Sequence, residues 1–310
     1  MRDEVAAGLR RSPKELPSKY FYDARGAALF DQITRLPEYY LTRTERALLA
    51  ELMPAWLPAT GARTVVELGP GSAEKTGFLL AGILGSAHNV AYVPVDLSDA
   101  YLAAIIQRVS DRWPALPVIA VRADIGEALP VPAMVPRPVL FAFLGSTIGN
   151  FSTAAAVALL RRIRSRMSGA DRLLLGVDLR PGAGKPVAEV EAAYNDAQGV
   201  TAGFNRNLLR VLNRELGADF DVDAFEHEAG YDPSAHRVEM RLVARVPQRI
   251  EIPGAGWFRV EAGEAIRTEI SVKYDRAVVE ALFARAALRP ERWAADAEGR
   301  FALALAVPRP

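Results

Sequence analysis

Val65-Val66-Glu67-Leu68-Gly69-Pro70-Gly71-Ser72-Ala73-Glu74 joins a short apolar run to a glycine-rich turn, and this junction decides the fold. Glycine lets the backbone turn sharply and approach a ligand at distances where a Cβ atom would collide. Such turns follow the carboxyl end of a parallel strand and open a helix in nucleotide-binding α/β proteins. The stretch therefore predicts a strand, a turn that faces a nucleotide-like cofactor, and a helix.

The residues of the turn narrow the choice of cofactor. A dinucleotide fingerprint needs a small residue at its sixth position, where this chain has Glu74, so NAD and FAD are disfavoured. The order Glu-x-Gly-x-Gly is instead typical of Rossmann-like methyltransferases that use S-adenosylmethionine. A tight turn that binds nothing is the alternative. Gly182-Ala183-Gly184-Lys185 looks like a phosphate loop, but Pro186 replaces its Ser/Thr, and an ordinary loop is expected there.

The middle of the chain alternates short apolar runs with helical patterns, which predicts βαβ units and a doubly wound α/β sheet. The expected strands are 64–68, 90–95, 118–123, 139–144 and 172–177, and the expected helices are 74–84, 100–113 and 153–167. A helix that ends within 282–288 and a hairpin formed by 292–295 and 301–307 complete the far edge of the sheet.

This alternation breaks after residue 180. A long helical stretch, 186–216, precedes segments of alternating polarity at 237–246 and 249–260, which is too much chain for one loop. We expect residues 44–180 and 275–310 to form the cofactor-binding domain. Residues 1–43 and 181–274 are expected to form a second, α+β lobe that binds the substrate.

Composition excludes several classes of function. A net charge of +1 without a basic stripe gives no reason to expect nucleic-acid or membrane partners. The 310 residues include no cysteine, and the three histidines have no metal-site spacing, so no metal is expected. No apolar stretch of signal-peptide length follows Met1, so we expect a cytoplasmic protein. We also expect a monomer.

Polar residues at the ends of the predicted strands are the candidates for cofactor contacts. Asp96 closes the second strand, where a carboxylate can accept both hydroxyls of a ribose. Asp124 closes the third, where it can accept from the amine of adenine, and Lys75 could pair with a carboxylate. Helix capping and plain surface exposure are the alternative explanations for these residues.

Seven further segments, in order and with consistent spacing, closely resemble the L-histidine Nα-methyltransferases of ergothioneine biosynthesis. They are Phe143–Phe151, Tyr20–Asp23, Leu29–Ile33, Leu36–Tyr40, Ala193–Asp196, Gly199–Asn207 and Thr268–Ser271. The resemblance extends from about Ser12 to Val307. The chain departs from the family pattern at Leu41 and Pro70, which bears on loop geometry near the site.

The resemblance implies a two-lobed enzyme that moves three methyl groups from S-adenosylmethionine to the α-amine of histidine, giving hercynine. It implies cofactor binding by Gly69, Lys75, Asp96, Asp124 and Ile125. It implies histidine binding by Tyr39, Asn150, Tyr194, Met240, Glu269 and Ser271, with Asn150, Tyr39 and Tyr22 as the catalytic residues. The mono- and dimethylated forms of histidine would be the other substrates.

In that family the residues at the positions of Asn150 and Tyr194 bind the backbone groups of the amino acid. The residues at the positions of Glu269 and Ser271 bind the imidazole. Without the resemblance, Tyr39 and Tyr194 would be packing residues, Asn150 a helix N-cap, and Glu269 and Ser271 outward-facing strand residues. Two other functions stay open. One is Nα-methylation of another aromatic amino acid, such as a tryptophan derivative; the other is a non-catalytic binding protein of the same fold.

Overall fold

The computed structural model describes residues 1–71 and 74–309, and the chain divides into two compact units. The first unit comprises Met1–Tyr40 and Pro186–Ser271, and the second comprises Leu41–Lys185 and Val272–Pro310. The sequence predicted breaks after residues 43, 180 and 274. In the described part of the chain, no helix combines the length and apolar character needed to cross a membrane.

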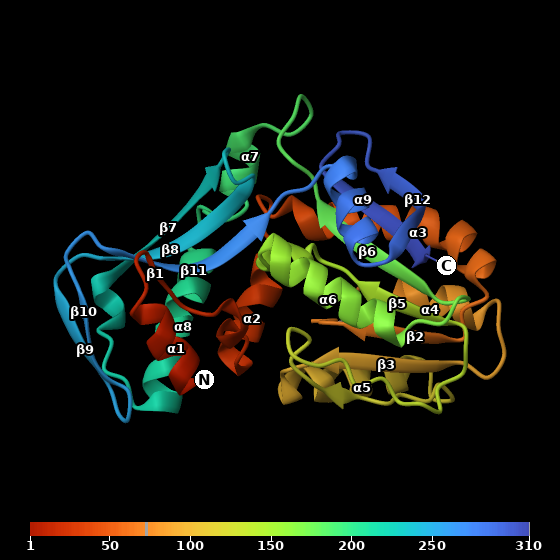
Figure 1. Cartoon of the computed structure of the whole chain (residues 1–310), viewed down its shortest axis with the longest axis horizontal. Helices are drawn as coiled ribbons and strands as arrows, with labels where there is room; N and C mark the ends of the chain where they lie inside the picture. The colour runs from red at the N-terminus through yellow and green to blue at the C-terminus, as the bar shows by residue number, and fades with distance from the viewer. Residues whose placement is uncertain (72–73, 310) are drawn as a thin grey trace. The chain divides into compact units, whose positions relative to one another are not determined.

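The second unit is built on a seven-stranded sheet with the order β12-β13-β6-β5-β2-β3-β4 (Figure 1). Strands β4, β3, β2, β5 and β6 run parallel to one another, whereas β13 is antiparallel to both β6 and β12. The strands are β2 Thr64–Leu68, β3 Ala91–Asp96, β4 Val121–Arg122, β5 Val139–Phe143, β6 Arg172–Asp178, β12 Leu288–Ala295 and β13 Phe301–Pro308. The doubly wound sheet is confirmed, with an antiparallel hairpin at one edge.

One expected strand is shorter than predicted. The segment 118–123 pairs with β3 at an isolated bridge between Tyr92 and Val118 and again over Val121–Arg122. The residues between these two contacts leave the ladder, so only a two-residue strand is regular. Apolar content predicted a buried strand, but the pairing of this segment is interrupted, its residues are half-buried or exposed, and Ile119 is exposed.

Helices cover the sheet on both faces. Helices α6 (Thr153–Arg166) and α9 (Arg276–Arg285) lie over one face, as Figure 1 shows, and enclose a core with alternate residues of the strands. Helix α4 (Thr76–Leu84) contacts β2 and α5 (Asp99–Arg112) contacts β3, while Gly82 of α4 lies close to Leu57 of α3 (Tyr40–Thr60). The central strands are buried on both sides, which explains their continuous apolar sequence.

The first unit contains a four-stranded sheet, β1-β11-β8-β7, and a β9-β10 hairpin. Its strands are β1 Lys14–Glu15, β7 Phe225–Asp232, β8 Arg237–Ala244, β9 Gln248–Ile252, β10 Gly256–Val260 and β11 Ala265–Val272. Its helices are α1 Arg2–Leu9, α2 Ala24–Ile33, α7 Val187–Ala192 and α8 Val200–Leu216, with 3-10 turns at Ser18–Phe21 and Val222–Ala224. These helices and strands form the second, α+β lobe that the sequence predicted.

The prediction of one long helical stretch over 186–216 was wrong. Helix α7 ends at Ala192 and α8 begins at Val200, after Gly199 adopts a φ of +70°. The carboxylate of Asp196 accepts hydrogen bonds from the backbone N–H groups of Val200 (2.9 Å) and Thr201 (2.7 Å). It therefore caps α8, and the segment between the helices carries Tyr194.

A buried charge cluster ends the central strand β6. The carboxylate of Asp178 accepts from Lys185 Nζ (2.5 Å) and Lys273 Nζ (2.7 Å), and all three side chains are almost completely buried. Lys185 also donates to the carbonyl groups of Leu179 and Arg300. The loop 182–185 is thus an ordinary loop, as expected, but its lysine is a buried structural residue.

We predict that Asp178→Asn lowers the free energy of unfolding by roughly 3–5 kcal/mol, because it leaves two buried ammonium groups without their carboxylate. Urea unfolding followed by circular dichroism measures the change. Glu280→Gln is the control, because the Arg276–Glu280 pair is solvent-exposed and should contribute less than about 1 kcal/mol. Equal losses in the two variants would contradict a structural role for the Asp178 cluster.

Candidate functional site

The glycine turn leaves β2 at the carboxyl edge of the sheet. Gly69 has a φ of +61° and Gly71 a φ of +56°, a region that favours glycine. The N–H of Gly69 donates to the carbonyl of Val95 (2.9 Å), which fixes the turn beside the end of β3. Residues 72 and 73 of the predicted turn lie outside the described residues. The described part has the conformation expected of a cofactor loop.

Glu67, the acidic residue before the turn, is fully buried inside the unit. Its Oε2 accepts from the hydroxyl groups of Thr76 (2.6 Å) and Tyr92 (2.7 Å), and burial raises the pKa of its carboxyl group. Glu67 thereby ties the first residue of α4 to β2 and β3. Its role is to shape the turn from within.

Two aspartates follow neighbouring strands at the same edge. Asp96 accepts from the N–H of Ser98 (2.8 Å), and burial raises the pKa of its carboxyl group. Asp124 accepts from the N–H of Gly126 (2.8 Å). A carboxylate accepts several hydrogen bonds, so a backbone donor can orient each one and leave it able to bind hydroxyl or amine groups. Gly69, Asp96 and Asp124 therefore form one edge suited to an adenosine.

Ile125 lies beside Asp124 and packs partly against the apolar core of the sheet. Its carbonyl accepts from the guanidinium of Arg162 (2.9 Å), which fixes the backbone of this loop. The side chain can thus contribute an apolar surface next to the aspartate that precedes it.

Glu45 of α3 joins the glycine turn to the loop after β5. Its carboxylate is fully buried, accepts from Lys75 Nζ (2.5 Å), and receives the N–H of Gly145 at 2.8 and 2.9 Å. The predicted cofactor residue Lys75 is therefore held by a carboxylate of its own unit. Sequence reasoning missed Glu45, because one glutamate on a helix carries no signal for its partners.

The loop that carries Asn150 is held in place by backbone constraints. Gly145 and Ser146 both have positive φ, and Asn150 ends a 3-10 turn, Thr147–Asn150. The Ser146 hydroxyl accepts from the N–H of Asp178 (2.9 Å), and Tyr274 donates to the carbonyl of Ile148 (3.2 Å). Ser152, rather than Asn150, is the N-cap of α6. The helix-capping explanation for Asn150 is therefore wrong.

In the first unit the predicted tyrosines share one aromatic cluster. Phe30 lies edge-on to both Tyr22 (5.6 Å between ring centroids) and Tyr39 (6.2 Å). Tyr39 in turn lies edge-on to Tyr194 (6.4 Å), and Phe204 contacts Tyr22 and Phe30. Tyr22, Tyr39 and Tyr194 therefore belong to one cluster of aromatic rings.

The hydroxyl of Tyr194 donates to Ser271 Oγ of β11 at 2.8 Å, and both side chains are buried. Glu269 is half-buried on the same strand, two residues earlier, so the two side chains share a strand face. The structure therefore brings Tyr22, Tyr39, Tyr194, Glu269 and Ser271 to one region of the first unit.

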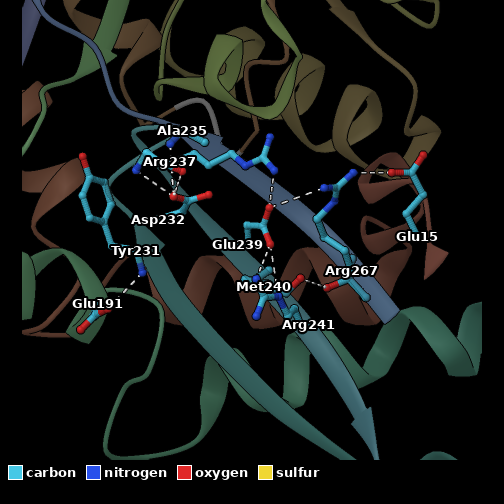
Figure 2. A network of polar contacts seen from close by, with 12 residues as sticks. Glu15, Glu191, Tyr231, Asp232, Ala235, Arg237, Glu239, Met240, Arg241 and Arg267 are labelled. Carbon is cyan, nitrogen blue, oxygen red and sulfur yellow. Dashed lines mark hydrogen bonds and ion pairs between the residues drawn. The ribbon is translucent and has the colours of Figure 1, made fainter. Parts of the chain in front are cut away.

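Met240 is buried on β8, whereas its neighbour Glu239 takes part in an arginine network (Figure 2). Glu239 lies between Arg237, Arg241 and Arg267, and Arg267 also pairs with Glu15. Burial opposes ionisation, but hydrogen bonds from Arg241 and Arg237 hold the pKa of Glu239 below its usual value. These ion pairs join β8, β11 and β1 and so support the strands that carry Met240 and Glu269.

No cluster of three or more metal-ligating side chains occurs within residues 1–71 and 74–309. The first unit offers aromatic rings, hydroxyl groups and the carboxylate of Glu269, and the second offers backbone groups and carboxylates at the strand ends. Such groups orient a substrate and exclude water.

Comparison with known proteins places these features in a family. The model of the family described as "Histidine-specific methyltransferase, SAM-dependent" matches residues 1–308 of this chain. Histidine N-alpha-methyltransferase of Mycolicibacterium smegmatis is 43% identical over 99% of this chain and 94% of its own length. Ergothioneine biosynthesis protein 1 of Neurospora crassa is 29% identical over 82% of this chain, which spans 30% of that longer protein. An S-adenosylmethionine-dependent methyltransferase of Clostridium acetobutylicum shares the fold, with a TM-score of 0.51, 12% identity, and coverage of 92% and 98% of the two chains.

We predict that Asp96→Ala weakens S-adenosylmethionine binding about 10- to 100-fold, because the loss of hydrogen bonds to a charged group costs roughly 1.5–3 kcal/mol. Isothermal titration calorimetry measures the dissociation constant. Asp111→Ala, an exposed aspartate on α5, is the control and should leave it unchanged. Unaltered cofactor affinity in the Asp96 variant would contradict a contact between Asp96 and the ribose hydroxyls.

Proposed function

Since the chain belongs to the S-adenosylmethionine-dependent, histidine-specific methyltransferase family, we propose that it methylates the α-amine of L-histidine three times to give hercynine. The match of the family over residues 1–308 carries the proposal. The name of the M. smegmatis relative supports histidine as the substrate, and that of the N. crassa relative supports a place in ergothioneine synthesis.

The cofactor residues proposed for S-adenosylmethionine are Gly69, Lys75, Asp96, Asp124 and Ile125. Asp96 would accept the ribose hydroxyls and Asp124 the adenine amine, with Ile125 beside the base. Lys75 would face the carboxylate of the methionine moiety, its ammonium group positioned by Glu45. When bound, the sulfonium supplies an electrophilic methyl group, and the chain's own residues have to present a nucleophile to it.

The nucleophile is the neutral α-amine of the substrate. An α-amino group ordinarily has a pKa of about 8, so most of it is protonated at neutral pH. Groups near the amine should therefore not stabilise the ammonium form. We propose Tyr22, Tyr39 and Asn150 as the catalytic residues, because hydroxyl and amide groups are uncharged and can both donate and accept hydrogen bonds. A carboxylate in the same place would raise the pKa of the amine and slow its attack.

The imidazole of the substrate is proposed to bind at the opposite end, against Glu269 and Ser271. Glu269 would accept an imidazole N–H or pair with imidazolium, and Met240 would contribute apolar surface. Tyr194, which donates to Ser271, would connect this end to the backbone groups of the amino acid. A site with buried polar groups rejects analogues that leave those groups unpaired.

The test of the proposed function is mass spectrometry of the products formed from S-adenosylmethionine and histidine, with tryptophan and tyrosine in parallel reactions. The expected product is histidine carrying three methyl groups, with transient mono- and dimethylated forms. Methylation of tryptophan or tyrosine in preference to histidine would overturn the substrate, and no methylated product would overturn the activity.

We predict that Glu269→Gln raises the dissociation constant for histidine at least tenfold while the affinity for S-adenosylmethionine stays within twofold, because a hydrogen bond to a charged group contributes roughly 1.5–3 kcal/mol. Calorimetric titration with each ligand separates the two effects. Glu226→Gln changes an exposed glutamate of the same unit and serves as the matched control. Parallel loss of both affinities in the Glu269 variant would sink its imidazole role.

A further inference from the structure

A chain of buried and half-buried hydrogen bonds supports Tyr194, the tyrosine that contacts Ser271. The ring of His227 on β7 contacts the backbone carbonyl of Tyr194 through Nε2 (2.8 Å) and the side-chain amide of Asn205 through Nδ1 (2.8 Å). Asn205 is fully buried on α8, and its Nδ2 also donates to the carbonyl of Arg241 (2.9 Å). The Thr268 hydroxyl donates to Asn205 Oδ1 at 2.7 Å and contacts the carbonyl of Met240 at 3.1 Å.

The hydrogen-bond partners determine the protonation state of His227. The carbonyl of Tyr194 only accepts, so Nε2 of the ring must carry a proton. The carbonyl of Arg241 also only accepts, so the amide nitrogen of Asn205 faces both this carbonyl and Nδ1 of the ring. Nδ1 therefore accepts, and His227 is neutral with its proton on Nε2.

We infer that His227 is a positioning residue for substrate binding: its neutral ring holds the backbone of Tyr194, so that the Tyr194 hydroxyl meets Ser271. The inference rests on the proposed function, in which Tyr194 and Ser271 contact histidine. Around Tyr194 the backbone forms turns, in which the N–H groups of Tyr194 and Asn195 donate to the carbonyls of Glu191 (3.0 Å) and Ala192 (3.1 Å). Side chains attach these turns to β7: His227 contacts the carbonyl of Tyr194, and the amide of Asn195 donates to the carbonyl of Ala229 (2.9 Å).

The surroundings of His227 keep the ring neutral. Burial is the largest effect and lowers the pKa of the imidazole, and the nearby guanidinium of Arg206 on α8 acts in the same direction. Asp196, before α8, and Glu228, on β7, oppose this, as does the hydrogen bond to the Tyr194 carbonyl. The folded-state pKa lies below the usual value, so the neutral ring is present at neutral pH and is lost as the pH falls.

Two substitutions test the role. His227→Gln keeps an N–H donor for the Tyr194 carbonyl on a side chain that does not titrate, whereas His227→Leu removes both hydrogen bonds. We expect the leucine variant to raise KM for histidine about tenfold, with KM for S-adenosylmethionine within twofold of wild type. The glutamine variant should recover most of the loss. His88→Leu, an exposed histidine of the second unit, is the control and should change neither constant.

The pH dependence distinguishes positioning from a general structural role. Histidine as substrate titrates in every reaction, so the ratio of the wild-type KM to the His227→Gln KM isolates the ring of His227. This ratio should rise as the pH is lowered from 8 to 5, because a protonated Nδ1 no longer accepts the hydrogen bond from Asn205 that orients the ring. A flat ratio, or equal rises in both KM values in the leucine variant, would overturn the inference. Absence of methylated histidine with the wild-type protein would instead overturn the proposed function.

Discussion

The carboxylate of Asp178 is the constraint on which both the sheet and its loops depend. It ends β6 and neutralises two ammonium groups, from Lys185 and Lys273, that are almost wholly removed from water. The chain leaves the second unit directly after Lys185 and returns to it just before Lys273. The buried carboxylate of Asp178 therefore anchors both of these crossing points to the second unit. Burying ions costs several kcal/mol each unless partners satisfy them, which leaves this cluster few alternative arrangements.

The same strand end also fixes the loop of Asn150. The backbone N–H of Asp178 donates to Ser146, and Tyr274, which follows Lys273, donates to the carbonyl of Ile148. Two residues of positive φ precede the 3-10 turn, and such a backbone persists only where its surroundings hold it. The loop that carries Asn150, a proposed binding residue, is therefore held by the backbone of Asp178, by Tyr274, and by Glu45, which accepts from the N–H of Gly145.

The sequence predicted the sheet well, because its strands are buried on both faces and are short, apolar runs bounded by turns. The glycine turn and the two aspartates could be found for the same reason, since their positions follow from the ends of the strands. The sequence did not reveal the break between α7 and α8, because the apolar periodicity continues through it. The hydrogen bonds by which Asp196 caps α8 depend on where its side chain lies in three dimensions. Glu45 and His227 escaped notice because their partners lie 100 and 33 residues away in the sequence. The roles of Tyr39, Asn150 and Glu269 came from the family resemblance, and no pattern of charge or spacing would have supplied them.

The proposed threefold methylation would explain why the amine is met by uncharged groups that can both donate and accept hydrogen bonds. Each transfer replaces one N–H donor of the substrate with a methyl group, so the hydrogen bonds available to the site change from step to step. Hydroxyl and amide groups can donate in one step and accept in another, whereas a carboxylate can only accept and would hold the ammonium form. Aromatic rings also offer apolar surface to the added methyl groups. The cluster of Tyr22, Phe30, Tyr39 and Tyr194 combines these properties, and its polar support, from Ser271 to the neutral ring of His227, lies within the same unit.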